Sequence, residues 1–240
     1  MTAFPGFEER WSSVAIFSPA LVIFDCDGVL VDSEVLACAV EMKILGDIGH
    51  PIDEAGFKRD IVGTKRADSL AFLEKSWGRP LPEDYAGRVD VTLDAAFRSD
   101  LVAIAGMPEL VANITAPICV ASSSAYPRLR LGLGLTGYAP LFGEHVFSSV
   151  DVARGKPAPD LFLHVATKMD VEPERCLVIE DSLPGVRAGK AAGMTVIGFV
   201  GGGHCGPGHA EALKQAGADL VAADAGDLAI SLRGLGLLAT

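Results

Sequence analysis

The sequence of 240 residues predicts an α/β fold, a doubly wound parallel sheet with an inserted α-helical domain. Short apolar runs with little polar alternation recur along the chain, which is typical of parallel strands covered on both faces. Helix-like segments separate these runs, and one long stretch holds no comparable run. The three observations together indicate right-handed β-α-β units that are interrupted by an insertion.

The expected strands are the runs at 21–25, 117–122, 144–149, 176–181 and 195–200. Segment 159–169 is an expected helix because Leu161, Val165 and Met169 recur every four residues and share one face. Segment 182–193 is another, since Pro184 stands near its start and Gly193 just past its end.

The stretch from about residue 35 to residue 103 has a pattern typical of helices and holds no run of residues typical of a buried strand. We therefore expect a core formed by residues 1–35 and 104–240, with a helical domain formed by residues 36–103.

Charge and composition narrow the class of protein. The net charge of −11 disfavours a nucleic-acid or anionic-membrane surface, because a basic stripe would be needed to overcome the repulsion. The first residues lack the basic and apolar regions of a signal peptide, and no window approaches the length of a membrane span. Five scattered cysteines suit reduced thiols. We expect a cytoplasmic protein, either a monomer or a small homo-oligomer.

Polar residues follow several of the expected strands. Because the carboxyl ends of parallel strands meet at one edge of the sheet, these residues should converge there. Clustered carboxylates repel one another unless a cation neutralises them, and oxygen ligands select Mg²⁺. A lysine and a hydroxyl would then serve the oxygens of a phosphate. The pattern indicates phosphoryl transfer, and the residues that carry it are Asp25, Asp27, Ser122, Lys156, Glu180 and Asp181.

These four motifs, in this order, resemble those of the haloacid dehalogenase-like (HAD) hydrolases, which form an aspartyl-phosphate on a Rossmann-like core. The motifs are Asp25-Cys26-Asp27-Gly28, Ser122, Lys156 in GKPAPD, and Glu180-Asp181. The insert after the first motif resembles the helical cap of the subgroup that contains β-phosphoglucomutase, phosphoglycolate phosphatase and 6-phosphogluconate phosphatase-like enzymes. A lone DxDG would be weak evidence, but four motifs at strand ends are specific.

The resemblance implies a role for each acid. Asp25 would be the nucleophile, and Asp27 the general acid and then the base for water. Mg²⁺ would be held by the Asp25 side chain, the Asp27 carbonyl and Asp181, with Glu180 acting directly or through water.

The expected phosphate-binding groups are Lys156, the backbone amides after Asp27, which can approach the phosphate because Gly28 has no side chain, and a serine hydroxyl. Ser122 is favoured for that hydroxyl because it ends the strand, although the assignment can slip to Ser123 or Ser124.

The segment 60–70, DIVGTKRADSL, resembles the cap loop that faces the catalytic pocket in this subgroup, and the resemblance implies that Lys65 and Arg66 hold a remote anionic or polyol group of the substrate. Two adjacent cations are also informative in an otherwise acidic protein. The alternative interpretation is that these two residues are an ordinary pair of solvent-exposed charges at the start of a helix. The segment with His204, Cys205 and His209 contains soft-metal ligand types but is interpreted as a glycine-rich loop.

The favoured function is a Mg²⁺-dependent phosphatase that acts on a small sugar phosphate or sugar-acid phosphate. One alternative is a mutase of the β-phosphoglucomutase type, disfavoured because Ala37 stands where such mutases carry a histidine. Another is a non-catalytic binding module, which loss of a motif residue would favour, and none is lost. A dehalogenase is disfavoured because those relatives lack the second acid at Asp27 and need no Mg²⁺.

Overall fold

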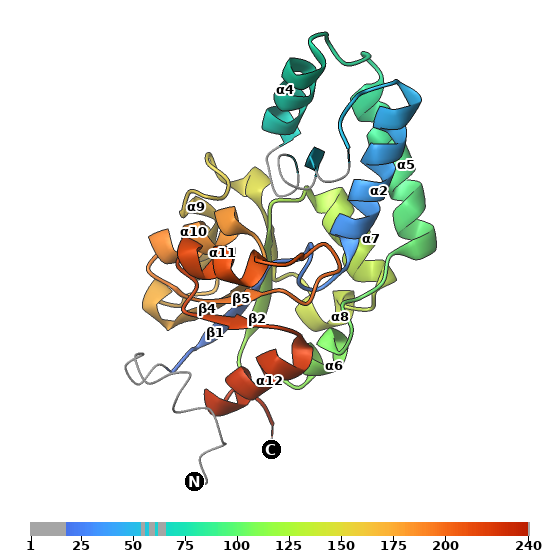
Figure 1. Cartoon of the computed structure of the whole chain (residues 1–240). Coiled ribbons are helices and arrows are strands. Elements are labelled where there is room, and N and C mark those ends of the chain that lie inside the picture. Colours follow the sequence, from blue (N-terminus) through green and yellow to red (C-terminus); the bar gives the residue numbers. More distant parts are fainter. Residues whose placement is uncertain (1–17, 54–55, 58–60, 62–65, 240) are drawn as a thin grey trace. The chain divides into compact units, whose positions relative to one another are not determined.

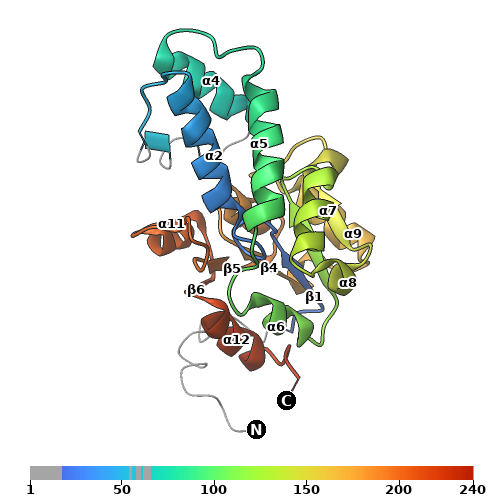
Figure 2. The same ribbon diagram turned by 90° about the vertical axis from the view of Figure 1, so that its right-hand side faces the viewer.

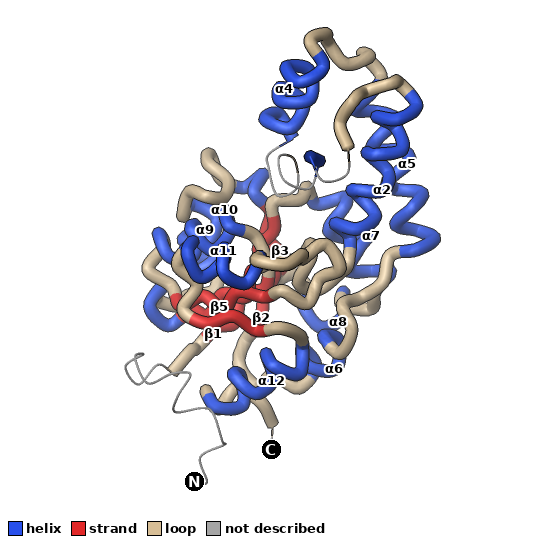
Figure 3. Tube along the Cα trace, in the orientation of Figure 1, coloured by secondary structure: helices blue, strands red, loops and turns tan. Residues whose placement is uncertain are grey.

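The core of the protein is a six-stranded parallel sheet. The computed structural model describes residues 18–53, 56–57, 61 and 66–239. The strand order is β3-β2-β1-β4-β5-β6, and Figure 3 shows these strands in red between helices. Their bounds are β1 Leu21–Phe24, β2 Ile118–Ser122, β3 Val146–Ser148, β4 Cys176–Glu180, β5 Thr195–Phe199 and β6 Leu220–Ala222.

The order of the strands reverses between β1 and β4. The chain adds β2 and β3 on one side of β1 and then crosses to its other side, where β4, β5 and β6 follow. In open α/β sheets the ligand lies outside the carboxyl ends of the strands at this switch point. β1 and β4 are direct neighbours, with Phe24 opposite Ile179. The residues that follow these two strands therefore lie at the switch point.

Helices cover both faces of the sheet in this unit. The longer helices of the core are α7 Tyr126–Leu135, α9 Asp160–Lys168, α10 Leu183–Ala191, α11 His209–Ala216 and α12 Ala225–Gly234, and the shorter ones are α6 Met107–Ala112 and α8 Ala139–Phe142. Two 3-10 turns, Ser149–Asp151 and Pro173–Arg175, complete the connections. Figure 1 shows α9, α10 and α11 on one side of the strands and α6, α8 and α12 on the other.

The alternation of side chains along the strands divides the core between these two layers. Leu21 and Ile23 belong to a buried cluster that also includes Phe162 of α9 and Val186 of α10. On the opposite face, Phe24 packs edge-to-face on Phe142 of α8, with ring centroids 6.2 Å apart. Burial on both faces explains why the strands read as continuous apolar runs.

A second compact unit spans Ser33–Leu101. In the described part of this unit, the helices with defined bounds are α2 Ser33–Asp47, α4 Arg66–Trp77 and α5 Tyr85–Asp100, and α2 packs along α5, as Figure 2 shows. Tyr85, Val89, Leu93 and Phe97 recur every four residues on α5 and are buried. Among the described residues, no helix has the length and apolar character needed to cross a membrane.

The predicted fold class and the five predicted strands are confirmed, with ends that differ by one or two residues. The predicted helices at 159–169 and 182–193 are α9 and α10, and Gly193 follows α10 with a φ of 78°. The sixth strand, β6, was not predicted. Its three residues give no usable pattern, and only pairing with β5 defines it as a strand.

The contact between α10 and β5 generates a prediction about stability. A Cβ added at Gly189 would lie 2.7 Å from Cγ2 of Val196, which is closer than real Cβ contacts. We expect Gly189→Ala to lower the free energy of unfolding by about 1–3 kcal/mol, as overpacked cores do. Urea unfolding followed by circular dichroism measures this change.

Gly134→Ala is the matched control, since Gly134 is an exposed helical glycine with no atom near its added Cβ. It should leave stability unchanged or raise it by up to about 1 kcal/mol. Equal stabilities for the two variants would contradict the packing argument.

Candidate active site

Three buried carboxylates meet at the switch point of the sheet. Asp25 directly follows β1, Glu180 ends β4, and Asp181 comes next. The backbone N–H of Asp25 donates to the carbonyl oxygen of Ile179 at 2.9 Å, which fixes the two strand ends side by side. One carboxylate oxygen from each of the three acids lies within 4.8 Å of the others. The structure therefore brings together the acids that the sequence placed at strand ends.

Lys156 joins two of these acids. Its Nζ donates to Asp25 Oδ1 at 2.6 Å and to Glu180 Oε2 at 2.7 Å. It also donates to the carbonyl oxygen of Ala121 at 3.0 Å. An ammonium has three hydrogens, so these bonds use its full donor capacity. Lys156 thus links Asp25, the predicted nucleophile, to Glu180 of the fourth motif.

Burial controls the electrostatics of the cluster. Burial, followed by the charge of Glu180, raises the pKa of Asp25 and of Asp181 well above the usual range. For Lys156, burial acts to lower the pKa, but Asp25 and Glu180 outweigh it and hold the pKa above its ordinary value. One ammonium therefore faces three carboxyl groups. This deficit of positive charge and the all-oxygen donor set fit a hard divalent cation such as Mg²⁺.

Asp27 interacts with serines that follow β2. Its Oδ2 accepts a hydrogen bond from Ser124 Oγ at 2.7 Å and a longer one from Ser122 Oγ at 3.3 Å. Ser122 Oγ also accepts from the Ser124 backbone N–H at 3.0 Å. The structure thus places Ser122 and Ser124 beside Asp27, whereas Ser123 is exposed. Ser124 is a residue that sequence reasoning left as an alternative.

Two glycines allow close approach around the acids. Gly28 has a φ of 79°, and a side chain there would overlap the Asp181 carboxylate and the His204 ring. Gly185 lies in the first turn of α10, where a Cβ would overlap the Glu180 carboxylate. Ser182, the N-cap of α10, donates to Glu180 Oε1 at 2.5 Å. Both oxygens of Glu180 are therefore engaged, one by Ser182 and one by Lys156.

Two histidines contact Asp181, and sequence reasoning did not place them there. His204 Nε2 lies 2.9 Å from Asp181 Oδ2, and His209 Nε2 lies 2.6 Å from the Asp181 carbonyl oxygen. The segment 201–208 is a loop, as interpreted from its glycines. It leaves the carboxyl end of β5, so the rule used for the other strand ends could have located it.

Cys26 lies between the two aspartates in sequence, but its properties differ. Its side chain is 2% exposed, and burial, followed by the charge of Asp27, raises the pKa of its thiol well above the ordinary value. A thiol held in its protonated form is a poor nucleophile.

Of the two cationic residues expected in the cap, the structure describes only Arg66. Lys65 lies outside the described residues. Arg66 begins α4 and reaches α5, where its guanidinium donates to Asp90 Oδ1 at 2.7 Å and to the Ala86 carbonyl oxygen at 2.9 Å. The Arg66 side chain is 49% exposed, so it remains accessible to solvent.

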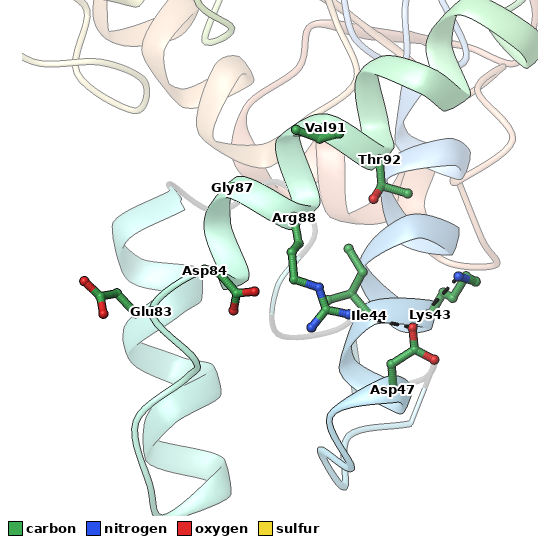
Figure 4. Close-up of a pocket in the computed structure, with 9 residues that line it drawn as sticks. All are labelled: Lys43, Ile44, Asp47, Glu83, Asp84, Gly87, Arg88, Val91 and Thr92. Atoms are coloured by element: carbon green, nitrogen blue, oxygen red, sulfur yellow. Dashed lines mark ion pairs between the residues drawn. The ribbon is translucent and has the colours of Figure 1, made fainter.

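A groove of about 540 Å³ lies within the unit Ser33–Leu101 and is shown in Figure 4. Three of its charged groups pair with one another, since Asp47 Oδ2 lies 3.9 Å from both Lys43 Nζ and Arg88 Nη2. None of the described residues that were proposed from the sequence lines it. The lining residues are Lys43, Ile44, Asp47, Glu83, Asp84, Gly87, Arg88, Val91 and Thr92.

Comparison with known proteins agrees with this fold. A crystal structure of a conserved haloacid dehalogenase-like protein of unknown function from Agrobacterium tumefaciens strain C58 superposes with a TM-score of 0.83, at 37% identity over 91% of this chain and 99% of that one. A HAD family hydrolase from Deinococcus radiodurans R1, solved with bound phosphate and sodium, gives a TM-score of 0.77 at 34% identity over 92% of this chain and 98% of that one.

Sequence comparison identifies the family. The 6-phosphogluconate phosphatase of Escherichia coli K12 is 35% identical over 185 residues, which cover 76% of this chain and 83% of that protein. The profile of the haloacid dehalogenase-like hydrolases matches residues 19–193, the range that contains all four motifs and the insertion. The chain belongs to the haloacid dehalogenase-like hydrolases, as its motifs predicted.

Proposed function

We propose that the protein is a Mg²⁺-dependent phosphatase that hydrolyses a small sugar phosphate or sugar-acid phosphate through an aspartyl-phosphate intermediate. The observation that carries the proposal is the buried arrangement of Asp25, Glu180 and Asp181 around Lys156. Similarity to a 6-phosphogluconate phosphatase supports both the reaction and the substrate class.

The two aspartates after β1 divide the chemistry. Asp25 attacks phosphorus and forms an O–P bond while the bond to the leaving oxygen breaks. Asp27 gives that oxygen its proton, and Ser122 and Ser124 orient the Asp27 carboxyl group. Asp27 then takes a proton from water as the water attacks phosphorus, which releases inorganic phosphate and regenerates Asp25.

The remaining groups bind the cation and the phosphate. Asp25, the Asp27 carbonyl and Asp181 would hold Mg²⁺, which supplies charge neutralisation and polarises the phosphoryl oxygens when bound. Glu180 acts through water, because its oxygens are already engaged by Lys156 and Ser182.

Lys156 contributes the positive charge beside the transferred phosphoryl group. The backbone at Gly28 and the polar groups of Ser122 and Ser123 surround its oxygens.

Substrate selection is assigned to the helical unit, which would act as the cap of a catalytic core. Lys65 and Arg66 are the proposed contacts to the remote anionic or polyol end of the substrate. A mutase receives no support from α2, because Ala37 cannot serve as a proton-transfer group.

The first prediction concerns the metal. EDTA should reduce phosphate release to background, and excess Mg²⁺ should restore it, because the carboxyl cluster lacks positive charge without a cation. The measurement is inorganic phosphate release from a panel of sugar phosphates, sugar-acid phosphates and phosphoglycolate. Undiminished turnover in metal-free buffer would refute the proposed site.

The second prediction separates the two aspartates. Asp25→Asn should lower kcat on the order of 10³-fold or more and form no phosphoenzyme, because the attacking carboxylate is lost. Asp27→Asn should lower kcat by about 10²- to 10⁴-fold and let phosphoenzyme accumulate from a substrate with a good leaving group. Acid-quenched labelling followed by peptide mapping detects the intermediate.

Asp100→Asn, at the exposed end of α5, is the control and should behave as wild type. Phosphate found on a residue other than Asp25 would overturn the assignment.

The third prediction concerns Cys26. Its raised pKa means that the thiolate is scarce at pH 8, so iodoacetamide should not label Cys26 in the folded protein. Labelling should appear once urea removes the burial that causes the shift. Mass spectrometry of tryptic peptides measures both states. Loss of activity in step with Cys26 labelling would instead indicate a thiol nucleophile.

The fourth prediction concerns the cap. Replacing Lys65 or Arg66 by Ala should lower kcat/KM for the anionic substrate by roughly 10- to 150-fold, the value of a charge-assisted contact of about 1.5–3 kcal/mol. Turnover of p-nitrophenyl phosphate should change only a few-fold, because that substrate has no remote anionic group. The ratio of the two losses is the quantity to measure.

Asp90→Asn is the control for Arg66, since it breaks the ion pair with α5 but keeps the cation. An equal loss in Arg66→Ala and Asp90→Asn would assign Arg66 to the structure of the helical unit. Equal losses on both substrates would reject the selectivity role.

A further inference from the structure

The segment that follows β5 brings together two imidazole groups and one thiol, which are ligand types that the carboxylate cluster does not contain. One ring nitrogen each of His204 and His209 and the Sγ of Cys205 lie within 4.8 Å of one another. Zn²⁺, Co²⁺ and related cations bind imidazole and thiolate ligands, whereas Mg²⁺ prefers oxygen ligands. Four residues separate His204 from His209, which is within the spacing of paired histidine ligands in zinc sites.

The distances suit a small cation. In a tetrahedral zinc site with bonds of about 2.0–2.3 Å, neighbouring ligand atoms are roughly 3.3–3.6 Å apart. His204 Nε2 and Cys205 Sγ are 3.3 Å apart, which already matches one edge of such a site. The three ligand atoms lie within 4.8 Å of one another, so a shift of roughly 1.5 Å or less brings His209 to the same spacing. The T-shaped arrangement of the two imidazole rings, at 5.9 Å between centroids, lets both approach a shared point.

The surrounding backbone makes room for the His204 ring. A Cβ at Gly202 would lie 2.8 Å from the ring, and a Cβ at Gly28 would lie 2.6 Å from its Cε1. The side chain of Asp32 accepts the backbone N–H of Gly203 at 3.0 Å and ties the loop to the end of the first motif. His209 is fixed separately, because it begins α11.

Access from solvent is also present. Cys26, Cys38, Cys119 and Cys176 are buried, whereas Cys205 and His209 are only partly buried. The side chain of His204 is 8% exposed. A cation can therefore reach this thiol without unfolding the core.

We propose that His204, Cys205 and His209 form a binding site for a thiophilic divalent cation of the Zn²⁺ class, distinct from the carboxylate cluster that would hold Mg²⁺. On binding, the Cys205 thiol loses its proton to solvent and both imidazoles bind as neutral ligands. Water or Asp181 Oδ2, which is 2.9 Å from His204 Nε2, completes the coordination.

The site also has a consequence for catalysis, which rests on the proposed function. His204 and His209 both contact Asp181, through its side chain and its carbonyl oxygen respectively. A cation bound by the loop that takes Asp181 Oδ2 as its fourth ligand withdraws this carboxylate from the arrangement that would hold Mg²⁺. Occupancy of the loop therefore inhibits phosphate release.

The binding test does not depend on turnover. Full-length protein without an affinity tag is reduced, freed of metals and titrated with Co²⁺ in excess Mg²⁺, which occupies the carboxylate cluster. We expect one equivalent of Co²⁺ to bind with a thiolate-to-metal charge-transfer absorption band. Cys205→Ser should abolish the band, and His209→Ala should weaken Co²⁺ binding at least about 10-fold. Zn²⁺ should displace Co²⁺ and remove the band.

Cys38→Ala and His145→Ala are the matched controls, because they remove a thiol and an imidazole outside the loop and should leave the titration unchanged. Circular dichroism verifies that each variant is folded. Absence of the band, or its persistence in Cys205→Ser, would overturn the proposal and leave the two histidines as positioning residues for Asp181.

The activity test separates the catalytic consequence from binding. With Mg²⁺ in excess, Zn²⁺ should inhibit phosphate release by the wild-type protein, and Cys205→Ser should need at least about 10-fold more Zn²⁺. Equal sensitivity of the two proteins would mean that Zn²⁺ competes at the carboxylate cluster, and the coupling through Asp181 would be rejected. A protein that binds Co²⁺ through Cys205 but releases no phosphate would refute the proposed function alone.

Discussion

The buried contact of Lys156 with Asp25 and Glu180 is the interaction on which the site depends. It joins the ends of β1 and β4 to the segment after β3, so three separate parts of the chain are held by one ammonium group. Removing one partner of a buried ion pair leaves an uncompensated charge, which is far more costly than losing an exposed pair. The same contact leaves the cluster short of positive charge. The single positive charge of Lys156 does not balance the carboxyl groups around it, so the site favours a divalent cation.

Close packing around the acids gives the site its precision. The first turn of α10 can approach Glu180 only because Gly185 has no side chain, and the turn after β1 can approach Asp181 only because Gly28 has none. Hydrogen bonds from Ser182 and Lys156 then use both oxygens of Glu180. Asp181 is held differently, by the imidazole groups of His204, in the loop after β5, and of His209, at the start of α11. Two adjacent acids in sequence therefore have different partners, and this difference separates their proposed roles.

The helical unit contributes a different kind of constraint. Its helix α5 carries a regular buried apolar stripe, whereas none of the charged side chains of α5 is buried. Arg66 illustrates the consequence, because its guanidinium bonds to α5 and yet stays about half exposed. An exposed ion pair contributes little to stability and can be exchanged for a ligand at small cost. The substrate selectivity that we propose for this unit would therefore rest on side chains that contribute little to stability.

The sequence by itself determined five of the six strands, the helices α9 and α10, and the convergence of Asp25, Lys156, Glu180 and Asp181, because buried parallel strands leave long apolar runs and their carboxyl ends share one edge. Short or partner-dependent features required the tertiary structure. β6 is too short to show a period and exists only through pairing with β5. The choice of Ser124 beside Asp27, and the approach of His204 and His209 to Asp181, depend on how loops fold in three dimensions. Loop residues carry no periodic signal, so only the packed structure decides which of them meet.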